Sequence, residues 1–356
     1  MEKRRWSIVF RCLCASATLF LFLAASAVPS LAAAPKYKLL WLFPISPPGG
    51  TFYAFTAAKE LGFWSQEGLE VDFKGTGGSG AAVQLMIAGH ASAGIPSMPA
   101  TLNAVGRGQK LHGFYQYSTG TLFFLKVMKN SPVQSVKDLK GKNIGITEPG
   151  GGEVPMVKAA LQGAGLDPDK DVRLIPIGEG SPATFDAIKS GRVAAYSSNF
   201  QDSLAVELAG VPLRDITPAE YGAFPAQMMV ATPDALKKNR EALIILARGV
   251  AKASLWCQSK PDQCEAMHRN ISQEEWATPQ VAKPLLTRAH QITKLPAAGR
   301  IGEPNKENLT KYLTFLKSIN PKFQAPKVEE FLVTDMLDEI NKFDREAVLK
   351  INYTKK

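Results

Sequence analysis

A glycine-rich turn, GTGGSG at residues 75–80, separates the strand-like LEVDFK from the helix-like GAAVQLMIAG. Its G-x-G-x-x-G spacing is typical of loops that bind the pyrophosphate of a dinucleotide. Such a site also needs an acidic residue about 20 positions further on to hold the ribose. No Asp or Glu occurs between Asp72 and Asp138, so the sequence argues against a dinucleotide, and we expect no cofactor.

The same turn suits a smaller anion. Gly78, Ser79 and Gly80 open a helix whose first N–H groups have no intrahelical partner and whose dipole favours negative charge. The acid-free stretch around it contains six basic residues: Lys74, Arg107, Lys110, Lys126, Lys129 and Lys137. A small anion is therefore the expected ligand. The alternative is that Ser79 only caps its own helix.

A second glycine-rich segment, TEPGGGEVPMVKAAL, places Gly151, Gly152 and Glu153 ahead of another helix. In YSSNFQD, Ser198 and Asn199 follow the end of a strand, which is where open α/β sheets bind ligands. Glu153 has two interpretations. It complements the helix dipole, or it binds an amine of the ligand.

Aromatic residues cluster where the first predicted strand ends, at Trp41 and Phe43 and then at Phe52 and Tyr53 after SPPGG. Most of them are expected in the core because they lie on or beside predicted elements. One or two could form the wall of an apolar pocket.

Short strands alternate with helices of about ten residues, a pattern that predicts parallel, doubly wound α/β sheets. Strands are expected at YKLLWLF, LEVDFK, NIGIT, DVRLIPIG and VAAYSSN, and from Asp234 onward the chain is almost wholly helical. A shift of 102 positions places Gly78-Ser79 on Gly180-Ser181, and Ser97 on Asn199. This internal similarity predicts two lobes of shared architecture.

The first 34 residues have the pattern of a secretory signal peptide. Lys3, Arg4, Arg5 and Arg11 precede the apolar run LCASATLFLFLAASAV, and the small-residue stretch PSLAAAP follows. The alternative, a retained membrane anchor, requires a longer apolar run. We therefore expect the mature protein to be exported.

Charge and cysteine content narrow the function further. The whole chain has a net charge of +10, and residues 1–34 contribute +4 − 1 = +3, which leaves +7. No block of basic residues is typical of nucleic-acid binding, so no nucleic-acid partner is expected. Cys257 and Cys264 lie within LWCQSKPDQCEAM, and an oxidising compartment favours a disulfide between them over two free thiols.

Catalytic and metal-binding motifs are weak. His90, His112, His268 and His290 do not have metal-ligand spacing, so no metal site is expected. GGSGA differs from the G-x-S-x-G nucleophile motif at Ala81. These observations argue against an enzyme.

The run from LLWLFPISPPGGTFYAF through FKGTGGSGAAVQLMIAGHASAGIPS resembles the opening of the nitrate/sulfonate/taurine solute receptors of ABC transporters, a family related to thiamine-pyrimidine proteins. VKDLKGKNIGI, FDAIKSGRVAAY and FLVTDMLDEINKFD extend the resemblance over the mature chain. It implies a type II periplasmic binding fold with two doubly wound α/β lobes. The first lobe would hold residues 36–118 and 228–356, and the second residues 119–227. Segments near STGTLFF and YGAFPAQMM would form a two-segment hinge.

The resemblance also implies a ligand site between the lobes. Its residues would be Phe43, Thr51, Phe52, Gly78, Ser79, Gly80 and Ser97 from the first lobe, and Gly151, Gly152, Glu153, Ser198 and Asn199 from the second. The cysteine-rich motif of the pyrimidine-synthesising relatives is absent, and no arginine in these loops could clamp a sulfonate.

The implied function is that of a monomeric periplasmic receptor. It would deliver a small organic, anionic solute to an ABC permease and its ATPase, and would meet the membrane only through the permease. A sensor-associated receptor of the same fold and a secreted α/β enzyme are the alternatives. The identity of the solute is not predicted.

Overall fold

The computed structural model describes residues 34–45, 49–149 and 151–354. The predicted signal peptide, apart from Ala34, lies outside the described residues. Within them, no helix is long and apolar enough to cross a membrane.

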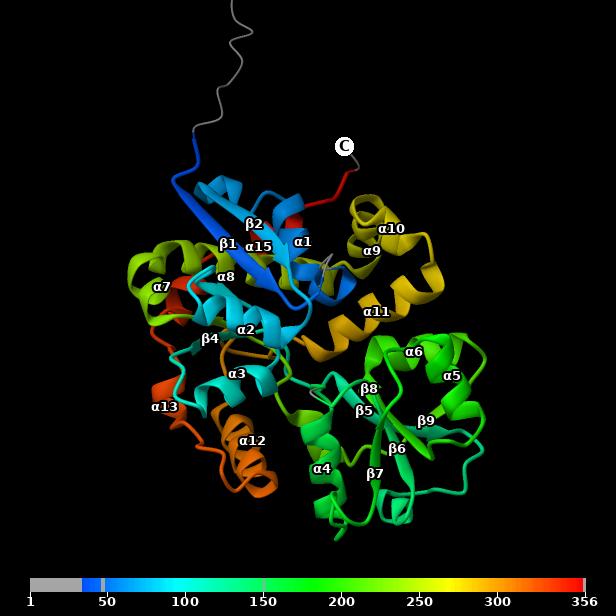
Figure 1. The fold of residues 1–356 in the computed structure, drawn as a ribbon. Coiled ribbons are helices and arrows are strands. Elements are labelled where there is room, and N and C mark those ends of the chain that lie inside the picture. Colours follow the sequence, from blue (N-terminus) through cyan, green and yellow to red (C-terminus); the bar gives the residue numbers. More distant parts are fainter. Residues whose placement is uncertain (1–33, 46–48, 150, 355–356) are drawn as a thin grey trace, which may run out of the picture. The chain divides into compact units, whose positions relative to one another are not determined.

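Within the described residues, ten strands form two separate five-stranded sheets, which Figure 1 shows as separate groups of arrows. The first sheet has the order β2-β1-β3-β10-β4 and the second has the order β7-β6-β8-β5-β9. The strands of the first sheet are β1 (Tyr37–Phe43), β2 (Leu69–Gly75), β3 (Ala93–Gly94), β4 (His112–Gln116) and β10 (Met228–Ala231). Those of the second are β5 (Phe123–Met128), β6 (Asn143–Ile146), β7 (Arg173–Pro176), β8 (Ala195–Asn199) and β9 (Leu213–Asp215).

Helices surround both sheets. We call each sheet with the helices packed on it a lobe. The second lobe contains α4 (Val154–Gly163), α5 (Pro182–Lys189) and α6 (Phe200–Leu208), with the 3-10 helix η3 (Val136–Leu139). The first lobe begins with α1 (Tyr53–Glu60), α2 (Ser79–Ile87) and α3 (Met98–Val105), with η1 (Gly50–Phe52) and η2 (Ser65–Glu67). Its C-terminal helices are α7 (Pro233–Lys238), α8 (Arg240–Ser259), α9 (Pro261–Ile271), α10 (Gln273–Trp276), α11 (Pro279–Ile292), α12 (Lys306–Ile319), α13 (Val328–Phe331), α14 (Leu337–Ile340) and α15 (Arg345–Lys350). The 3-10 helix η4 (Ala219–Ala223) lies between the two sheets in sequence.

The predicted α/β class is confirmed, but the sheets are mixed and not wholly parallel. Strand β10 runs antiparallel to β3 and β4, and β5 runs antiparallel to β8 and β9. The reason is the path of the chain. β5 is the first strand after the chain leaves the first sheet, and β10 is the first after it returns. Neither strand is preceded by the helical crossover that a parallel neighbour requires.

The internal similarity at an offset of 102 is confirmed by the topology. The orders β2-β1-β3-β10-β4 and β7-β6-β8-β5-β9 are equivalent position by position. Ser97 is the N-cap of α3 and Asn199 is the N-cap of α6, so the matched residues begin matched helices. All strands of the first sheet fall within residues 36–118 and 228–356, and all strands of the second within 119–227. The domain boundaries themselves stay predictions.

The core of the first lobe is built around α8. Its apolar residues recur at three-to-four spacing, so one face of the helix is buried against α1 and β1. Trp64 donates from Nε1 to the carbonyl of Leu246 in α8 at 3.0 Å. The segment predicted to be helical from Asp234 onward begins with two helices, α7 and α8, which meet at Asn239. Cys257 of α8 and Cys264 of α9 form a disulfide, with Cα atoms 5.0 Å apart.

Two chain segments connect the sheets side by side. The N–H groups of Tyr117 and Ser118 donate to the carbonyl of Gln227, each at 3.2 Å, and Gln227 N–H donates to Ser118 Oγ at 2.8 Å. Thr121 N–H donates to the carbonyl of Gly222 at 3.1 Å. A third contact joins Thr119 N–H to the carbonyl of Ile292, at the end of α11, at 2.7 Å. These bonds couple the crossing segments to each other and to the C-terminal helices.

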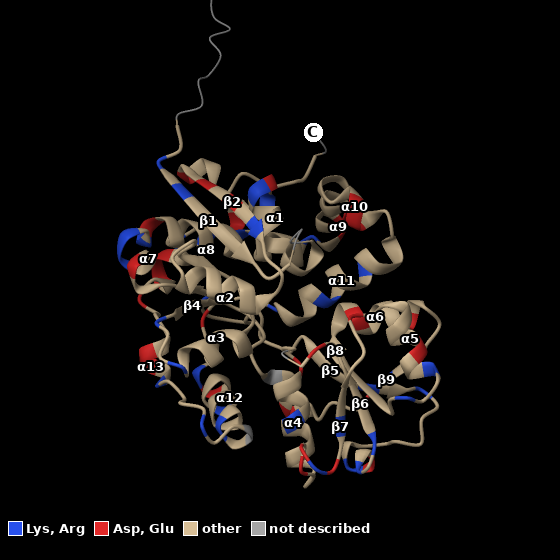
Figure 2. Ribbon diagram, in the orientation of Figure 1, with Lys and Arg blue, Asp and Glu red and all other residues tan. Residues whose placement is uncertain are grey.

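Charges are mixed along the ribbon. Figure 2 shows acidic and basic residues interspersed on helices such as α7 and α12. Many of them form exposed pairs one helical turn apart, as in Lys238–Asp234 and Lys311–Glu307. Exposed pairs of this kind contribute little to stability because water and salt screen the attraction.

Candidate functional site

The glycine-rich turn of the first lobe is anchored to the end of β1. Thr76 Oγ1 lies 2.9 Å from the carbonyl oxygens of both Phe43 and Gly78, and Gly78 N–H donates to the carbonyl of Pro44 at 3.0 Å. Gly78 has a φ of 114°, which is a backbone conformation reserved for glycine. A Cβ placed at Gly78 or Gly80 would meet no atom within 4 Å. Hydrogen bonds therefore fix the turn to the end of β1, whereas the space next to the Cα atoms of Gly78 and Gly80 is open.

The helices that follow this turn and β3 leave their first N–H groups without side-chain caps. Neither Gly78 at α2 nor Ser97 at α3 makes a side-chain capping bond. Ser79 Oγ instead accepts from Ser97 N–H at 3.0 Å and so ties the two helix starts together. This placement does not support the alternative in which Ser79 caps its own helix. The uncapped N–H groups carry partial positive charge and suit an anion.

The predicted aromatic wall lies mainly in the core. Phe43 is fully buried and its ring contacts those of Phe52, Phe55 and Phe73. Phe52 is also buried, with its ring 6.0 Å from that of Tyr117. Neither ring has exposed surface that a solute could contact in this conformation. Thr51 is half-buried and remains accessible.

Glu153 has a role that neither sequence interpretation anticipated. Its side chain turns back along the loop, where Oε1 accepts from Thr147 N–H at 2.8 Å and from Thr147 Oγ1 at 2.6 Å. The residue is only 2% exposed. Burial raises the pKa of this carboxyl, while the hydrogen bonds from Thr147 oppose the rise. Glu153 therefore holds the Gly151-Gly152 loop against the end of β6.

At the end of β8 the polar residues are satisfied internally. Ser198 is fully buried and its Oγ contacts the carbonyl of Asn199 and Ser203 Oγ. Asn199 Oδ1 accepts from Asp202 N–H at 3.0 Å and so caps α6. Ser198 thus has no surface for a solute, and Asn199 presents only its remaining amide group.

Sequence reasoning missed Asp202, in the first turn of α6. It is 8% exposed, and among the described residues its Oδ2 has no hydrogen-bond partner. Burial, reinforced by the nearby charges of Glu179 and Glu153, raises its pKa to about 7. Acidic residues are common in the first turn of a helix, so no local pattern distinguishes Asp202.

Sequence reasoning also missed Arg288, which lies inside α11 and not in a loop. Its guanidinium carbon is 5.0 Å from the ring of Phe124 and 5.9 Å from the ring of Phe200, both in the second lobe. Its Nη2 donates to the carbonyl of Thr121 at 3.3 Å, and within the described residues its Nε has no partner. Burial lowers the pKa of this guanidinium, while Asp215 opposes the change. An arginine in a helix carries no local signal of such a position.

Helix α11 brings predicted residues of both lobes into one region. It packs against η1, which contains Thr51 and Phe52, and it also packs against α6, which begins next to Asn199. The α10–α11 end of this region is fixed by Glu275, whose two carboxylate oxygens accept from Gly50 N–H at 3.0 Å. Arg288 therefore lies next to Phe200, the residue that follows the predicted Asn199.

A cavity of about 300 Å³ lies elsewhere in the first lobe. It is bounded by Tyr115, Gln116 and Tyr117, by Ser254, and by the segment from Thr293 to Asn305. None of the predicted ligand residues lines it. The candidate site consists of the uncapped starts of α2 and α3 together with Arg288, whose Nε has no hydrogen-bond partner among the described residues.

Comparison with solved structures shows the fold. A protein from Bordetella bronchiseptica RB50 is similar over 86% of this chain and 97% of its own, with a TM-score of 0.67 and 22% identity. The periplasmic aliphatic sulphonate binding protein SsuA from Escherichia coli has a TM-score of 0.64 at 15% identity, with 84% of this chain and 92% of that chain covered. The desulfurization enzyme DSZB has a TM-score of 0.57 at 16% identity, with 86% and 99% covered. The two-lobed fold is that of periplasmic binding proteins.

Sequence comparison gives the family. No curated protein sequence matches the chain significantly. Residues 50–264 match the family model described as NMT1/THI5 like, which spans more than half of the 356 residues. The chain therefore belongs to the NMT1/THI5-like family.

Proposed function

We propose that this protein is a periplasmic receptor that binds a small organic anion between its two lobes and delivers it to an ABC importer. Two features of the chain support the receptor role. Hydrogen-bonded crossing segments join the lobes, an arrangement that suits hinge closure. The relative SsuA is a periplasmic sulphonate-binding protein with the same fold.

The observation that carries the proposal is the position of Arg288. It reaches from α11 to the second lobe, and its Nε lacks a partner among the described residues. A planar guanidinium matches carboxylate and sulfonate oxygens through paired hydrogen bonds. Rotation of this side chain toward the uncapped starts of α2 and α3 would complete an anion site with donors from both directions.

The two lobes would then recognise different ends of the solute. The first lobe offers N–H groups at α2 and α3, which attract negative charge. The second lobe offers Asp202, a buried carboxyl with one free oxygen. We infer that the end of the solute that faces the second lobe carries a hydrogen-bond donor, because a second anionic group there would meet Asp202.

A thermal-shift screen of the mature chain tests the proposal. The panel holds small carboxylates and sulfonates with and without an amino or hydroxyl group, together with neutral and cationic compounds as controls. A ligand at 100 times its Kd raises the free energy of unfolding by about 2.7 kcal/mol. We expect organic anions to raise the melting temperature. Shifts by neutral or cationic compounds alone would contradict the proposal.

Arg288→Ala is expected to weaken binding of the best anion by about thirtyfold. This corresponds to the loss of one charged hydrogen-bonding group, about 2 kcal/mol. The affinity of Arg288→Lys should lie between those of the wild type and of Arg288→Ala, because lysine keeps the positive charge but lacks the planar pair of donors of a guanidinium. Arg107→Ala, an exposed arginine in the first lobe, is the matched control and should bind normally. Titration calorimetry measures all four proteins, and equal affinities would remove Arg288 from the site.

The enzyme alternative has one supporting observation, the fold shared with DSZB. To test it, the best solute of the thermal-shift screen is incubated with the protein for a prolonged time, recovered and analysed by mass spectrometry. A receptor returns the solute unchanged, whereas turnover would replace the receptor proposal.

A further inference from the structure

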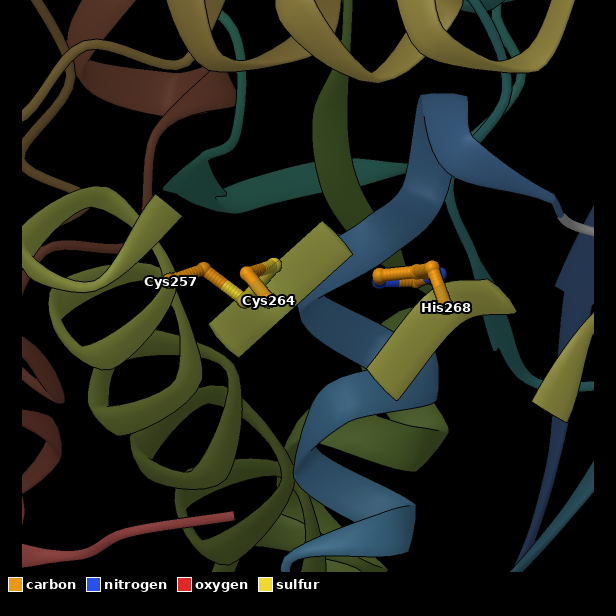
Figure 3. Close-up of side chains that lie close together, drawn as sticks. All are labelled: Cys257, Cys264 and His268. Atoms are coloured by element: carbon orange, nitrogen blue, oxygen red, sulfur yellow. A yellow bond between two sulfur atoms is a disulfide. The ribbon is translucent and has the colours of Figure 1, made fainter. Parts of the chain in front are cut away.

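A compact cluster of sulfur and imidazole side chains lies in the core of the first lobe, away from the proposed solute site. Cys257 comes from the end of α8, and Cys264 and His268 lie one turn apart on α9. Their ligand atoms all lie within 4.8 Å of one another, and all three residues are fully buried. Figure 3 shows the ring of His268 beside the disulfide.

His268 has no structural explanation of its own. Its side chain is 0% exposed. The backbone of Tyr53 lies close to the ring, but among the described residues neither ring nitrogen has a partner at normal hydrogen-bond geometry. Buried polar atoms are nearly always partnered, and each one left unpaired costs about 1–3 kcal/mol. A buried imidazole with neither nitrogen hydrogen-bonded, next to two sulfur atoms, is therefore a candidate metal ligand.

His290 on α11 lies next to Cys264, although its ring nitrogens are not within 4.8 Å of all three of the other residues. His290 Nε2 lies 3.8 Å from Cys264 Sγ, and the ring of His290 packs edge-on against Tyr53 with centroids 4.4 Å apart. In a tetrahedral zinc site, Zn–S of about 2.3 Å and Zn–N of about 2.0 Å place neighbouring ligand atoms about 3.3–3.8 Å apart, with a sulfur and a nitrogen about 3.5 Å apart. The 3.8 Å between His290 and Cys264 is slightly longer than this, so a small movement of His290 would bring it to the metal. Two sulfurs and two imidazoles form the donor set of a closed structural zinc site.

The disulfide blocks this site in the structure described. Sulfur atoms bonded to each other offer no thiolate, and the thiolate is the form that binds a metal. The spacing of the histidines in the sequence does not predict this site. His268 on α9 and His290 on α11 reach the cysteines only through the packing of the helices, which the spacing does not encode.

We propose that reduction of the Cys257–Cys264 disulfide opens a zinc site formed by Cys257, Cys264 and His268, with His290 as the fourth ligand. A dithiol reductant gives two electrons and two protons to the disulfide and becomes a disulfide itself, which leaves two thiols. Zn²⁺ then displaces the two thiol protons, which pass to solvent. The same pair of cysteines thus links α8 to α9 by a covalent bond when oxidised and by a metal when reduced.

Cobalt binding to the whole mature chain tests the proposal. The protein is reduced with a phosphine, which is removed by anaerobic gel filtration, and is then titrated with Co²⁺. The reduced protein should bind one Co²⁺ with the charge-transfer and visible bands of a tetrahedral thiolate site, and one Zn²⁺ should displace it. The untreated, oxidised protein should give no such bands. Their absence from the reduced protein, or equal bands in both forms, would overturn the proposal.

Variants identify the ligands. Cys257→Ser with Cys264→Ser should abolish the thiolate bands, and His268→Ala should weaken cobalt binding at least tenfold. His90→Ala, an exposed histidine in the same lobe, is the matched control and should bind as wild type. Unchanged affinity in His268→Ala would contradict the assignment of that ligand.

A second measurement needs no variant and so does not depend on the folding of His268→Ala. The X-ray absorption spectrum of the reduced, zinc-loaded wild-type protein should show two sulfur and two nitrogen neighbours. A first shell of oxygen or nitrogen alone would place the zinc elsewhere and overturn the proposal.

Discussion

The two lobes have the same strand order but treat the loops after equivalent strands differently. After β1, the loop at Gly50 is held by Glu275, a residue 225 positions away on α10. After β6, the equivalent loop is held by Glu153, which belongs to the loop itself and accepts from Thr147. The second lobe is therefore locally self-sufficient, whereas the first depends on the C-terminal helices that carry Arg288.

The helix starts differ in the same way. In the second lobe, Ser181 accepts from Thr184 N–H and Asn199 accepts from Asp202 N–H, so α5 and α6 are capped by side chains. In the first lobe, Gly78 and Ser97 give α2 and α3 no side-chain cap. The two lobes share an architecture, but the first has helix starts without side-chain caps and the second has a buried carboxyl, Asp202. This asymmetry is the basis for proposing an oriented solute.

The largest effect expected within this comparison is the pH dependence from Asp202. Its pKa lies at about 7 against an ordinary value of 3.8, because burial disfavours the charged form. The folded state then binds more protons than the unfolded state between these values, so stability falls as pH rises from about 4 to about 7. Three pKa units correspond to about 4 kcal/mol as an upper bound. Asp202→Asn should flatten this part of the curve.

Urea unfolding at several pH values measures the effect. The difference between wild type and Asp202→Asn should grow with pH up to about 7 and then level off. Asp186→Asn, an exposed carboxylate on α5, is the control and should follow the wild-type curve. A difference in unfolding free energy between wild type and Asp202→Asn that stays constant across pH would show that burial does not disfavour the charged form of Asp202.

The loop anchors give the next largest effect. Thr147→Val removes the hydroxyl that donates to the buried Glu153 carboxyl, and a hydrogen bond to a charged group contributes about 2 kcal/mol. Thr76→Val removes the hydroxyl that anchors the glycine-rich turn of the first lobe to backbone carbonyls, and the free energy of unfolding should fall by about 1 kcal/mol. Chemical denaturation compares the two. Equal losses of unfolding free energy in the two variants would mean that the charge of Glu153 does not strengthen the hydrogen bond from Thr147.

The smallest change in stability is expected at Gly80, together with a clear change in binding. Gly80 lies in the first turn of α2 with open space around it, so Gly80→Ala should stabilise the fold by about 0.5 kcal/mol through helix propensity. Its added methyl group should obstruct a solute at the helix start and weaken binding at least tenfold. Gly78→Ala should instead destabilise the fold, because its φ of 114° strains any other residue. A Gly80→Ala protein that binds normally would move the solute away from α2.

Local sequence patterns predicted much of the fold. Alternating short strands and helices predicted the α/β class, and the matched positions of Gly78 and Gly180 predicted two similar lobes, because turns, helix starts and strand ends depend on nearby residues. The same patterns could not give the antiparallel direction of β5 and β10. That direction follows from where the chain crosses between sheets, which no local pattern encodes.

By itself, then, the sequence determined the elements, their repeat and the glycine turn that leaves α2 uncapped. Only the tertiary structure decided that Phe43 and Phe52 lie in the core, that Glu153 turns back onto Thr147, and that Arg288 reaches the second lobe. It also decided that His268 lies beside the cysteines. The physical reason is that the environment of a side chain is set by residues far away in the chain, which packing brings within a few ångströms.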